Sequence, residues 1–388
     1  MSRVSITSLS RLYDLTLCFC LACLVGGLKT TSVAQSQPAS AAFDFNEPAT
    51  ALEFIRQQHD LPAMGVAFVT TDGPQSLATA GVRKRGDTTA VTDQDLWHLG
   101  SCGKAMTATL IARLVEAGDL RFEQTLGESF PALAQDMDED LRSVTLFDLL
   151  SHRSGLPANF NLVAYLNQTD ARQARRQALL DAMQQPLLGT PGETYRYSNW
   201  GYTLAGHVAE QATDLAWEEL MQREVFGPLG ISSAGFGGLG TPGEIDQPWP
   251  HFVDGTALPN NGPQMDNVVA MGPAGRIHMN LEDWGKFVAE HLKGHRGESE
   301  FLTQESFRIL HTTRGDRYAL GWVVAPRPWA GGNALNHGGD NTMNHAVVWL
   351  APDKGFAALA TVNQSGTHAA TDQAVSGLIL AWLKQAQP

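Results

Sequence analysis

Apolar residues follow helical spacing through the middle of the chain and strand-like spacing near both of its ends. Met106, Leu110 and Leu114 recur every fourth residue ahead of Gly118, which predicts a helix that begins near Ser101. The same criterion predicts further helices over 49–58, 171–183, 204–213, 217–225, 281–292 and around 375–383. Apolar, β-prone runs predict strands over 64–70, 77–82, 318–324, 346–351 and 356–363.

Strands at both ends of the chain, with helices between them, predict an α+β fold. We expect one antiparallel sheet flanked by the N- and C-terminal helices, with a mostly helical insertion over roughly 101–270. The stretch 227–263 is crowded with Gly and Pro, and loops of this length are usually functional or disordered. We therefore expect it to form a wall or lid over a site.

The first 34 residues have the pattern of a secretory signal peptide. Arg3 and Arg11 precede the apolar run 15–28, which is too short to span a bilayer comfortably. Small residues at 32–34 then suit cleavage. We expect an exported protein, periplasmic or secreted, with no stable membrane span after processing. An uncleaved anchor, or a lipid anchor at Cys23, is the alternative.

A Ser/Gln/Ala/Pro linker over 35–48 is expected to be disordered, and 49–388 is expected to form the folded domain. The chain carries 27 Lys and Arg against 40 Asp and Glu, a net charge of −13. Removal of residues 1–34 leaves 24 basic and 39 acidic residues, a net charge of −15. This balance argues against nucleic acid or an anionic membrane surface as a partner. Beyond residue 34 the only cysteine is Cys102, so no intramolecular disulfide can form.

The start of the 101–117 helix contains S-x-x-K, Ser101 and Lys104. Residues three apart share a helix face, about 5–6 Å between their Cβ atoms, so the amine can reach the hydroxyl. A serine is a weak nucleophile until a neighbouring base activates it. The alternative is structural, because serine is also a common N-cap. Other elements must therefore converge on Ser101 for the motif to indicate catalysis.

Two further motifs supply what acyl transfer from a serine needs. In Tyr197-Ser198-Asn199, the phenol can act as a base only where a cation such as Lys104 lowers its pKa. Asn199 can orient Lys104 and donate to a substrate carbonyl. The third motif is His337-Gly338-Gly339, where glycines would let a substrate approach a strand edge. The backbone N–H groups of Ser101 and Asp340 are the candidate oxyanion hole.

Together these motifs resemble the serine β-lactamase-like family, which comprises class C β-lactamases, low-molecular-mass penicillin-binding proteins and related esterases. Thr145–Pro157 is similar to the family's loop after the nucleophile helix, and Pro191-Gly192 ahead of Tyr197 is similar to its tyrosine motif. The segments 272–287, 320–322 and 336–341 fit its C-terminal half. The resemblance implies catalytic Ser101, Lys104 and Tyr197, and substrate-binding Asn199, His337, Gly338 and Gly339.

Two features depart from the family's pattern. A second Y-x-N, at Tyr165–Asn167, lies in ordinary helical surroundings and is expected to be structural. His337 stands where the family's β-lactamases usually carry lysine, and a histidine of ordinary pKa is neutral at pH 7. This departure disfavours efficient hydrolysis of β-lactams and is shared with esterases and peptidases of the group.

The leading hypothesis is an exported serine hydrolase that forms an acyl-enzyme on Ser101. Its substrate would be a small molecule or peptide: a D-amino-acid peptide or amide, a β-lactam or a carboxylic ester. The rival is a non-catalytic relative that uses the cleft to bind a ligand of the cell envelope. No cofactor is expected, and the histidines show no metal-ligand spacing with carboxylates. Cys102 is expected to pack in the core, while His152 and Arg153 are expected to stabilise their loop.

Overall fold

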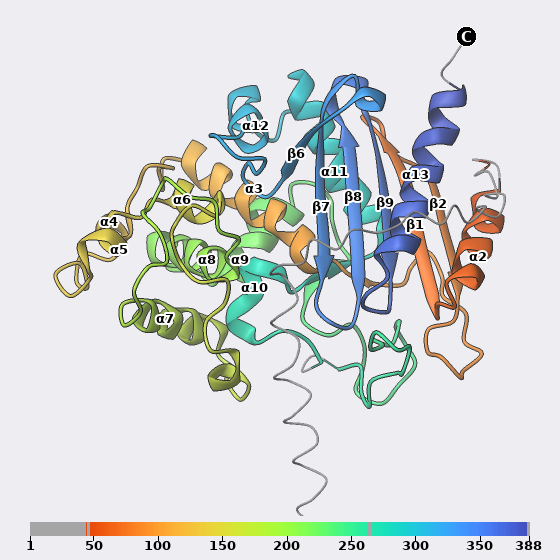
Figure 1. Cartoon of the computed structure of the whole chain (residues 1–388), viewed down its shortest axis with the longest axis horizontal. Helices are drawn as coiled ribbons and strands as arrows, with labels where there is room; N and C mark the ends of the chain where they lie inside the picture. The colour runs from red at the N-terminus through yellow and green to blue at the C-terminus, as the bar shows by residue number, and fades with distance from the viewer. Residues whose placement is uncertain (1–43, 45–46, 263–264, 386–388) are drawn as a thin grey trace, which may run out of the picture. The chain divides into compact units, whose positions relative to one another are not determined.

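The central sheet combines strands from the two ends of the chain (Figure 1). The computed structural model describes residues 44, 47–262 and 265–385. Six strands run in the order β2-β1-β9-β8-β7-β6, and every neighbouring pair is antiparallel. Their bounds are β1 Ala63–Thr70, β2 Gly73–Gly81, β6 Val323–Arg327, β7 Gly332–Asp340, β8 His345–Ala351 and β9 Phe356–Val362.

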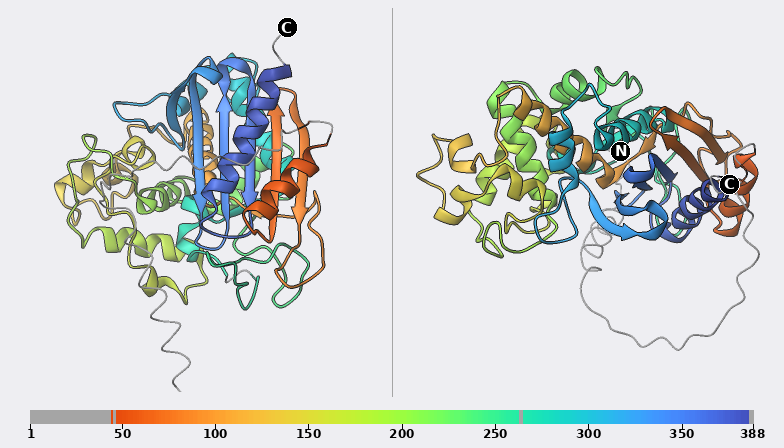
Figure 2. Two further views of the ribbon diagram at one scale, coloured as in Figure 1. Left: turned by 45° about the vertical axis from the view of Figure 1, so that its right-hand side comes forward. Right: turned by 90° about the horizontal axis from the view of Figure 1, so that it is seen from above.

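Helices cover both faces of this sheet (Figure 2). The first and last described helices, α2 (Pro48–Gln58) and α13 (His368–Gln385), pack on one face, and α11 (Leu281–Arg296) packs on the other. Successive side chains of a strand point to opposite faces. In β1, Met64, Val66 and Phe68 accordingly join the α2–α13 core, and Ala67 and Val69 join the second core.

The segment between β2 and β6 is mostly helical and lies beside the sheet (Figure 1). It contains a small second sheet in the order β3-β5-β4, with β3 Trp97–His98, β4 Gly235–Phe236 and β5 Ile277–Met279. Its helices are η2 Gly100–Cys102, α3 Gly103–Glu116, α4 Leu126–Ser129, α5 Glu139–Ser143, α6 Leu146–Leu150, η3 Leu162–Tyr165, α7 Ala171–Ala182, α8 Asn199–Thr213, α9 Trp217–Leu220, η4 Met221–Phe226, η5 Val269–Met271 and α10 Gly272–Gly275. The same segment also holds α11 and α12 Gln304–His311, and two short helices, η6 Pro328–Ala330 and η7 Pro352–Lys354, connect later strands.

The predicted α+β class and the placement of the terminal helices are confirmed. Two predicted boundaries were wrong, and one strand was missed. The run 318–324 contributes only its last two residues to β6, and the glycine-containing β7 was not predicted as a strand. α8 begins at Asn199 instead of Leu204, because Ser198 caps it by accepting a hydrogen bond from Gly201 N at 3.0 Å.

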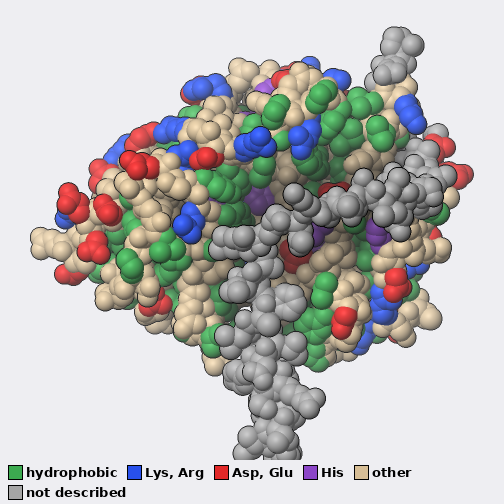
Figure 3. All heavy atoms as spheres, viewed as in Figure 1, with side chains coloured by type: hydrophobic (Ala, Val, Ile, Leu, Met, Phe, Trp, Pro, Cys, Tyr) green, Lys and Arg blue, Asp and Glu red, His purple; other side chains and the backbone are tan. Residues whose placement is uncertain are grey.

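The predicted signal peptide, 1–34, lies outside the described residues, as does the 35–48 linker apart from Asp44, Glu47 and Pro48. Both stay predictions. Within the described part of the chain, no helix is long and apolar enough to cross a membrane. On the face shown in Figure 3, acidic and basic side chains are interspersed without a continuous basic patch.

A buried ion-pair cluster joins three helices of the helical region. Arg175 of α7 contacts Glu210 of α8 at 2.6 Å and Glu218 of α9 at 2.7 Å, and the side chains of Arg175 and Glu210 are fully buried. Removal of one partner leaves a buried charge without compensation, which typically costs about 3–5 kcal/mol. We expect Arg175→Met to lower the free energy of unfolding by about that amount, measured by urea denaturation at pH 7.

Arg172 provides a matched control on the same helix, one turn away. It pairs with Asp214 at 2.7 Å, but their side chains are 41% and 93% exposed. Exposed pairs contribute between about 0 and 1 kcal/mol, so Arg172→Met should leave the urea midpoint nearly unchanged. If Arg175→Met and Arg172→Met lowered the free energy of unfolding equally, the buried cluster would not stabilise the helical region.

Candidate functional site

Ser101 lies in a tight turn between the small sheet and α3. Leu99 N donates to Ile277 O at 3.0 Å, and Gly100 adopts a positive φ of 50°. A Cβ on Gly100 would lie 2.7 Å from Asp340 N, so only glycine allows the turn to approach β7 this closely. Ser101 makes no capping hydrogen bond, and its side chain is partly exposed. The N-cap alternative for Ser101 is therefore wrong.

Lys104 is fully buried one turn after Ser101. Its Nζ lies 3.0 Å from Ser101 Oγ, 2.7 Å from Asn199 Oδ1 and 2.5 Å from the Ala274 carbonyl oxygen. Burial lowers the pKa of Lys104 to about 7, because the charged ammonium loses its hydration. A neutral amine has two N–H groups and one lone pair. The two N–H groups can donate to Asn199 Oδ1 and to the Ala274 carbonyl oxygen. That lone pair is then directed at the hydroxyl of Ser101.

Tyr197 contacts the same pair. Its phenol hydrogen-bonds with Ser101, and its ring centroid lies 4.9 Å from Lys104 Nζ. The expectation that Lys104 lowers the pKa of Tyr197 was wrong. Burial raises that pKa above its ordinary value, and this effect exceeds the lowering caused by the hydrogen bond to Ser101. At neutral pH Tyr197 is a neutral hydroxyl that can donate and accept, but it is not a phenolate base.

The helix cap at Ser198 places Tyr197 and Asn199. Ser198 Oγ donates to Pro157 O at 2.7 Å, and Asn199 N donates to Ala158 O at 2.8 Å. These bonds tie the start of α8 to the loop after α6. The Asn199 amide is oriented by Asn159, whose Oδ1 accepts from Asn199 Nδ2 at 2.8 Å. The oxygen of Asn199 therefore faces Lys104.

The edge of β7 forms the opposite side of the site. β7 pairs with β8 through Asp340 but with β6 only through Asn336, so 337–340 have no strand on their other edge. A Cβ on Gly339 would lie 2.0 Å from Leu99 O and 2.8 Å from Ser101 N. A Cβ on Gly338 would meet no atom within 4 Å. Gly339 thus packs against the Ser101 turn, and Gly338 leaves the strand edge open.

His337 is buried, and both of its ring nitrogens have partners within the protein. Nδ1 lies 2.7 Å from Gly338 O, and Nε2 lies 2.9 Å from the Tyr318 hydroxyl. A carbonyl only accepts, so Nδ1 carries the proton and Tyr318 donates to Nε2. Burial, and secondarily the charge of Lys104, lower the pKa of His337 to about 3. The imidazole is neutral at pH 7, as predicted, but it has no free nitrogen with which to bind a substrate.

A group of aromatic side chains supports Tyr197 from behind. The ring of His152 lies 4.2 Å from that of Tyr197 and 4.5 Å from that of Tyr318, and its Nδ1 accepts from Ser198 N at 3.0 Å. The hydroxyl of Tyr202 donates to Leu150 O at 2.7 Å. We predicted only a loop role for His152 and none for Tyr202 or Tyr318. The positive φ of His152, 60°, depends on tertiary packing and leaves no sequence signal.

The remaining candidates lie outside the site or in its walls. Tyr165 is buried, and its hydroxyl donates to Asp181 Oδ2 at 2.5 Å, which confirms its structural role. Cys102 is buried, and burial raises the pKa of its thiol, so it packs in the core as predicted. In the 227–263 loop, Trp249 is buried and donates to Leu258 O at 2.6 Å, which makes it a loop anchor.

Residues 49–380 match the family model described as Beta-lactamase. The chain therefore belongs to the beta-lactamase family, whose members are serine hydrolases that include penicillin-binding proteins and D-Ala-D-Ala carboxypeptidases. The fold agrees with this assignment, because it matches solved structures of a penicillin-binding protein homologue and of a D-alanine carboxypeptidase.

Three comparisons show the extent of the likeness. Penicillin-binding protein 4 of Amycolatopsis lactamdurans is 29% identical over 326 residues, 80% of this chain and 82% of that protein. A Beta-lactamase of Pseudomonas fluorescens is 25% identical over 325 residues, 81% and 85% of the two chains. The structure of D-alanine carboxypeptidase AmpC from Burkholderia cenocepacia shares the fold with a TM-score of 0.68 at 19% identity, covering 87% of this chain and 97% of that one.

Proposed function

We propose that the protein is an exported serine hydrolase that forms an acyl-enzyme on Ser101. The observation that carries the proposal is the 3.0 Å contact between Ser101 Oγ and the buried Lys104 Nζ, with a pKa of about 7 for that amine. Neutral Lys104 takes the hydroxyl proton as Oγ bonds to the substrate carbonyl carbon. A base whose pKa lies near the working pH is the most effective general catalyst. Export is proposed from the N-terminal sequence pattern alone.

The negative charge that develops on the carbonyl oxygen needs donors already in place. We assign this role to the backbone N–H groups of Ser101 and Asp340. The glycine contacts between the Ser101 turn and β7 support the assignment, because they bring the two backbone segments together. The proton then passes from Lys104 to the leaving group, with the neutral Tyr197 hydroxyl hydrogen-bonded to Ser101 Oγ. Attack by water on the acyl ester, with the same base, regenerates Ser101.

The substrate class follows from the open edge of β7. An extended acyl group can add its own amide to a free strand edge, and Gly338 places no side chain in its path. We propose D-amino-acid peptides or amides and carboxylic esters as the better substrates and β-lactams as the poorer ones. The neutral, fully hydrogen-bonded His337 supports this order, because it supplies no cation for a β-lactam carboxylate.

A hydrolysis panel tests the proposal: short-chain nitrophenyl esters, D-alanyl-D-alanine peptides and nitrocefin. A fluorophosphonate probe should label Ser101 stoichiometrically, as read by intact mass and peptide mapping. The rival is a binding protein without turnover. Absence of hydrolysis across the panel, together with absence of label on Ser101 when a control serine hydrolase is labelled, would favour that rival.

Substitution of Tyr197 by phenylalanine should reduce kcat/KM for a nitrophenyl ester about 10²-fold or more, because it removes a hydroxyl that contacts the reacting oxygen. Tyr165→Phe is the matched control. It removes the hydrogen bond to Asp181, which lowers stability by about 1.5–3 kcal/mol, but it should leave kcat/KM within about threefold of wild type. Equal losses of activity in the two variants would contradict the role of Tyr197.

A further inference from the structure

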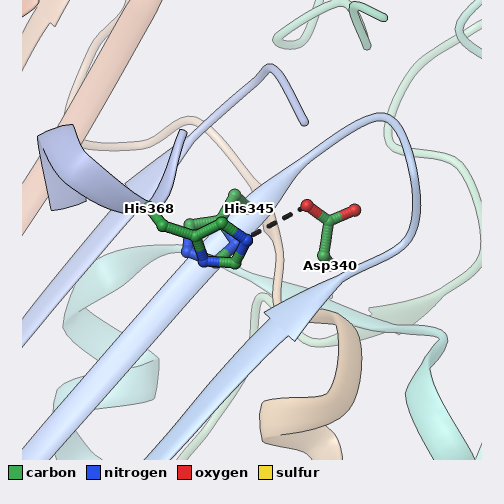
Figure 4. Close-up of side chains that lie close together, drawn as sticks. All are labelled: Asp340, His345 and His368. Atoms are coloured by element: carbon green, nitrogen blue, oxygen red, sulfur yellow. Dashed lines mark ion pairs between the residues drawn. The ribbon is translucent and has the colours of Figure 1, made fainter. Parts of the chain in front are cut away.

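A cluster of two imidazoles and a carboxylate lies at the end of the β7–β8 hairpin. Asp340 ends β7, His345 begins β8 and His368 begins α13. One ligand-type atom from each residue lies within 4.8 Å of the corresponding atoms of the other two. The three side chains converge in Figure 4, where the His345 and His368 rings lie next to each other at a centroid distance of 4.1 Å.

The fold explains this convergence, which spacing in the sequence did not predict. Asp340 and His345 are a cross-strand pair in the register of β7 and β8, and side chains of such pairs stand on the same face with Cβ atoms about 4.5–5.5 Å apart. The third residue comes from α13, which packs on the same sheet. Helix packing therefore adds His368 to a pair already formed by strand register.

His345 has a ring nitrogen without a hydrogen-bond partner. Its side chain is 3% exposed, and among the described residues its Nδ1 is a buried nitrogen that makes no hydrogen bond. Asp340 Oδ2, joined to Nδ1 by the dashed ion-pair line in Figure 4, lies 3.6 Å away, which is beyond the usual range for an N–H···O hydrogen bond. A buried polar atom left in this way destabilises the fold, a cost that arises because the atom has lost its hydration without gaining a partner. A ligand that accepts the lone pair of Nδ1 would remove this cost.

The carboxylate of Asp340 is held in place by its other neighbours. Ser365 Oγ lies 2.9 Å from both carboxylate oxygens, Thr342 N donates to Oδ1 at 2.5 Å, and Gly366 N donates to Oδ2 at 3.3 Å. Groups that orient a ligand in this way are a regular part of metal sites. These contacts fix the orientation of the carboxylate next to His345.

We propose that Asp340, His345 and His368 bind a Zn²⁺ ion. Two neutral imidazoles and a carboxylate suit zinc, whereas Mg²⁺ and Ca²⁺ prefer oxygen ligands. Bonds of about 2.0–2.2 Å place tetrahedral ligand atoms roughly 3.3–3.6 Å apart. Since the three ligand atoms lie within 4.8 Å of one another, each pair must close by at most about 1.5 Å. His368, on the exposed first turn of α13, can make that movement. Water would complete the tetrahedron.

Asp340 belongs to both proposed sites: its backbone N–H is a proposed oxyanion donor, whereas its carboxylate would bind the metal. Gly339, next to Asp340, packs on the Ser101 turn, so the metal would tie the end of β7 to β8 and α13. Binding can be measured without any substrate. The result therefore does not depend on the proposed hydrolase activity, and either proposal can fail while the other holds.

The experiment is a Zn²⁺ titration of the untagged full chain after chelator dialysis, by calorimetry and by Co²⁺ substitution. We expect one equivalent of Zn²⁺ to bind and to raise Tm, and Co²⁺ to give visible absorption typical of tetrahedral coordination. His368→Ala should weaken the binding about 100-fold or more, since loss even of an orienting partner costs about 10–100-fold. It should also abolish the Zn²⁺-dependent rise in Tm.

His59→Ala is the matched control. His59 follows α2, bonds to Gln373 of α13 at 2.8 Å and is not one of the three clustered residues, so its loss should leave the zinc affinity unchanged. Failure of the wild-type chain to bind a stoichiometric Zn²⁺, or equal affinity in wild type and His368→Ala, would overturn the proposal. Because His368 is exposed, the variant is expected to fold, and circular dichroism checks this directly.

Discussion

Ser101→Ala is expected to lower kcat/KM for a nitrophenyl ester on the order of 10⁴-fold or more, because no covalent intermediate can then form. The fold should be retained. Ser101 is partly exposed, caps no helix and loses only its hydrogen bonds to Lys104 and Tyr197, worth about 1 kcal/mol each. The measurement pairs steady-state kinetics with thermal unfolding, and the fluorophosphonate label should disappear.

Ser76→Ala provides a control for the serine substitution. Ser76 is a partly exposed serine of β2. This strand forms one edge of the sheet, and three strands separate it from β7. Its removal should change neither turnover nor labelling. If Ser101→Ala kept activity within tenfold of wild type, the hydrolysis would have to come from another residue, and the nucleophile assignment would be wrong.

The parts of the fold that follow from local patterning could be predicted from the sequence. The 106-110-114 spacing of α3 and the continuous β-prone run of β1 are local signals of a helix and of a strand, so both elements were found within a few residues. Ser101, Lys104, Tyr197 and Asn199 could be grouped because their motifs occur in a known order. The structure brings these four side chains into one contact network.

Features set by tertiary contacts were missed. β7 contains His337-Gly338-Gly339 just before its last residue, and glycine has low strand propensity, so only pairing with β8 and the close approach to Leu99 O make this part a strand. His152 lies behind Tyr197 with a positive φ that the loop sequence does not indicate. The cluster around His345 unites two strands and a helix.

Ionisation states also depend on burial, which the motifs do not reveal. From the sequence, Lys104 was expected to lower the pKa of Tyr197, and His337 was expected to keep an ordinary pKa. In the structure, desolvation is the largest influence on all three groups: it lowers the pKa of Lys104 and His337 and raises that of Tyr197. The general base is thereby reassigned from a shared Lys–Tyr pair to Lys104, and this reassignment can be measured.

Lys104→Met is expected to reduce kcat/KM about 10³-fold, within the range that general-base catalysis contributes. Methionine fills a similar volume but has no amine, so Asn199 Oδ1 and Ala274 O lose a donor, and stability should fall by about 1–3 kcal/mol. Lys293→Met, which changes a 40% exposed lysine on α11, should alter neither property. Since nucleophile and base act as a unit, Ser101→Ala/Lys104→Met should be no less active than Ser101→Ala alone.

The wild-type pH profile tests the same base without a substitution. Because the active form of Lys104 is the neutral amine and its pKa is about 7, kcat/KM should rise with pH, reach half its plateau near pH 7 and fall about tenfold per unit below pH 6. His337, with a pKa of about 3, and Tyr197, with its raised pKa, should not titrate between pH 5 and 9, so a single limb is expected. A neutral nitrophenyl ester keeps substrate ionisation out of the profile. A flat profile from pH 5 to 9, or a limb centred below pH 5, would show that Lys104 is not the base. Even full burial lowers the pKa of a lysine only to about 5–6, so its titration should still appear in this range.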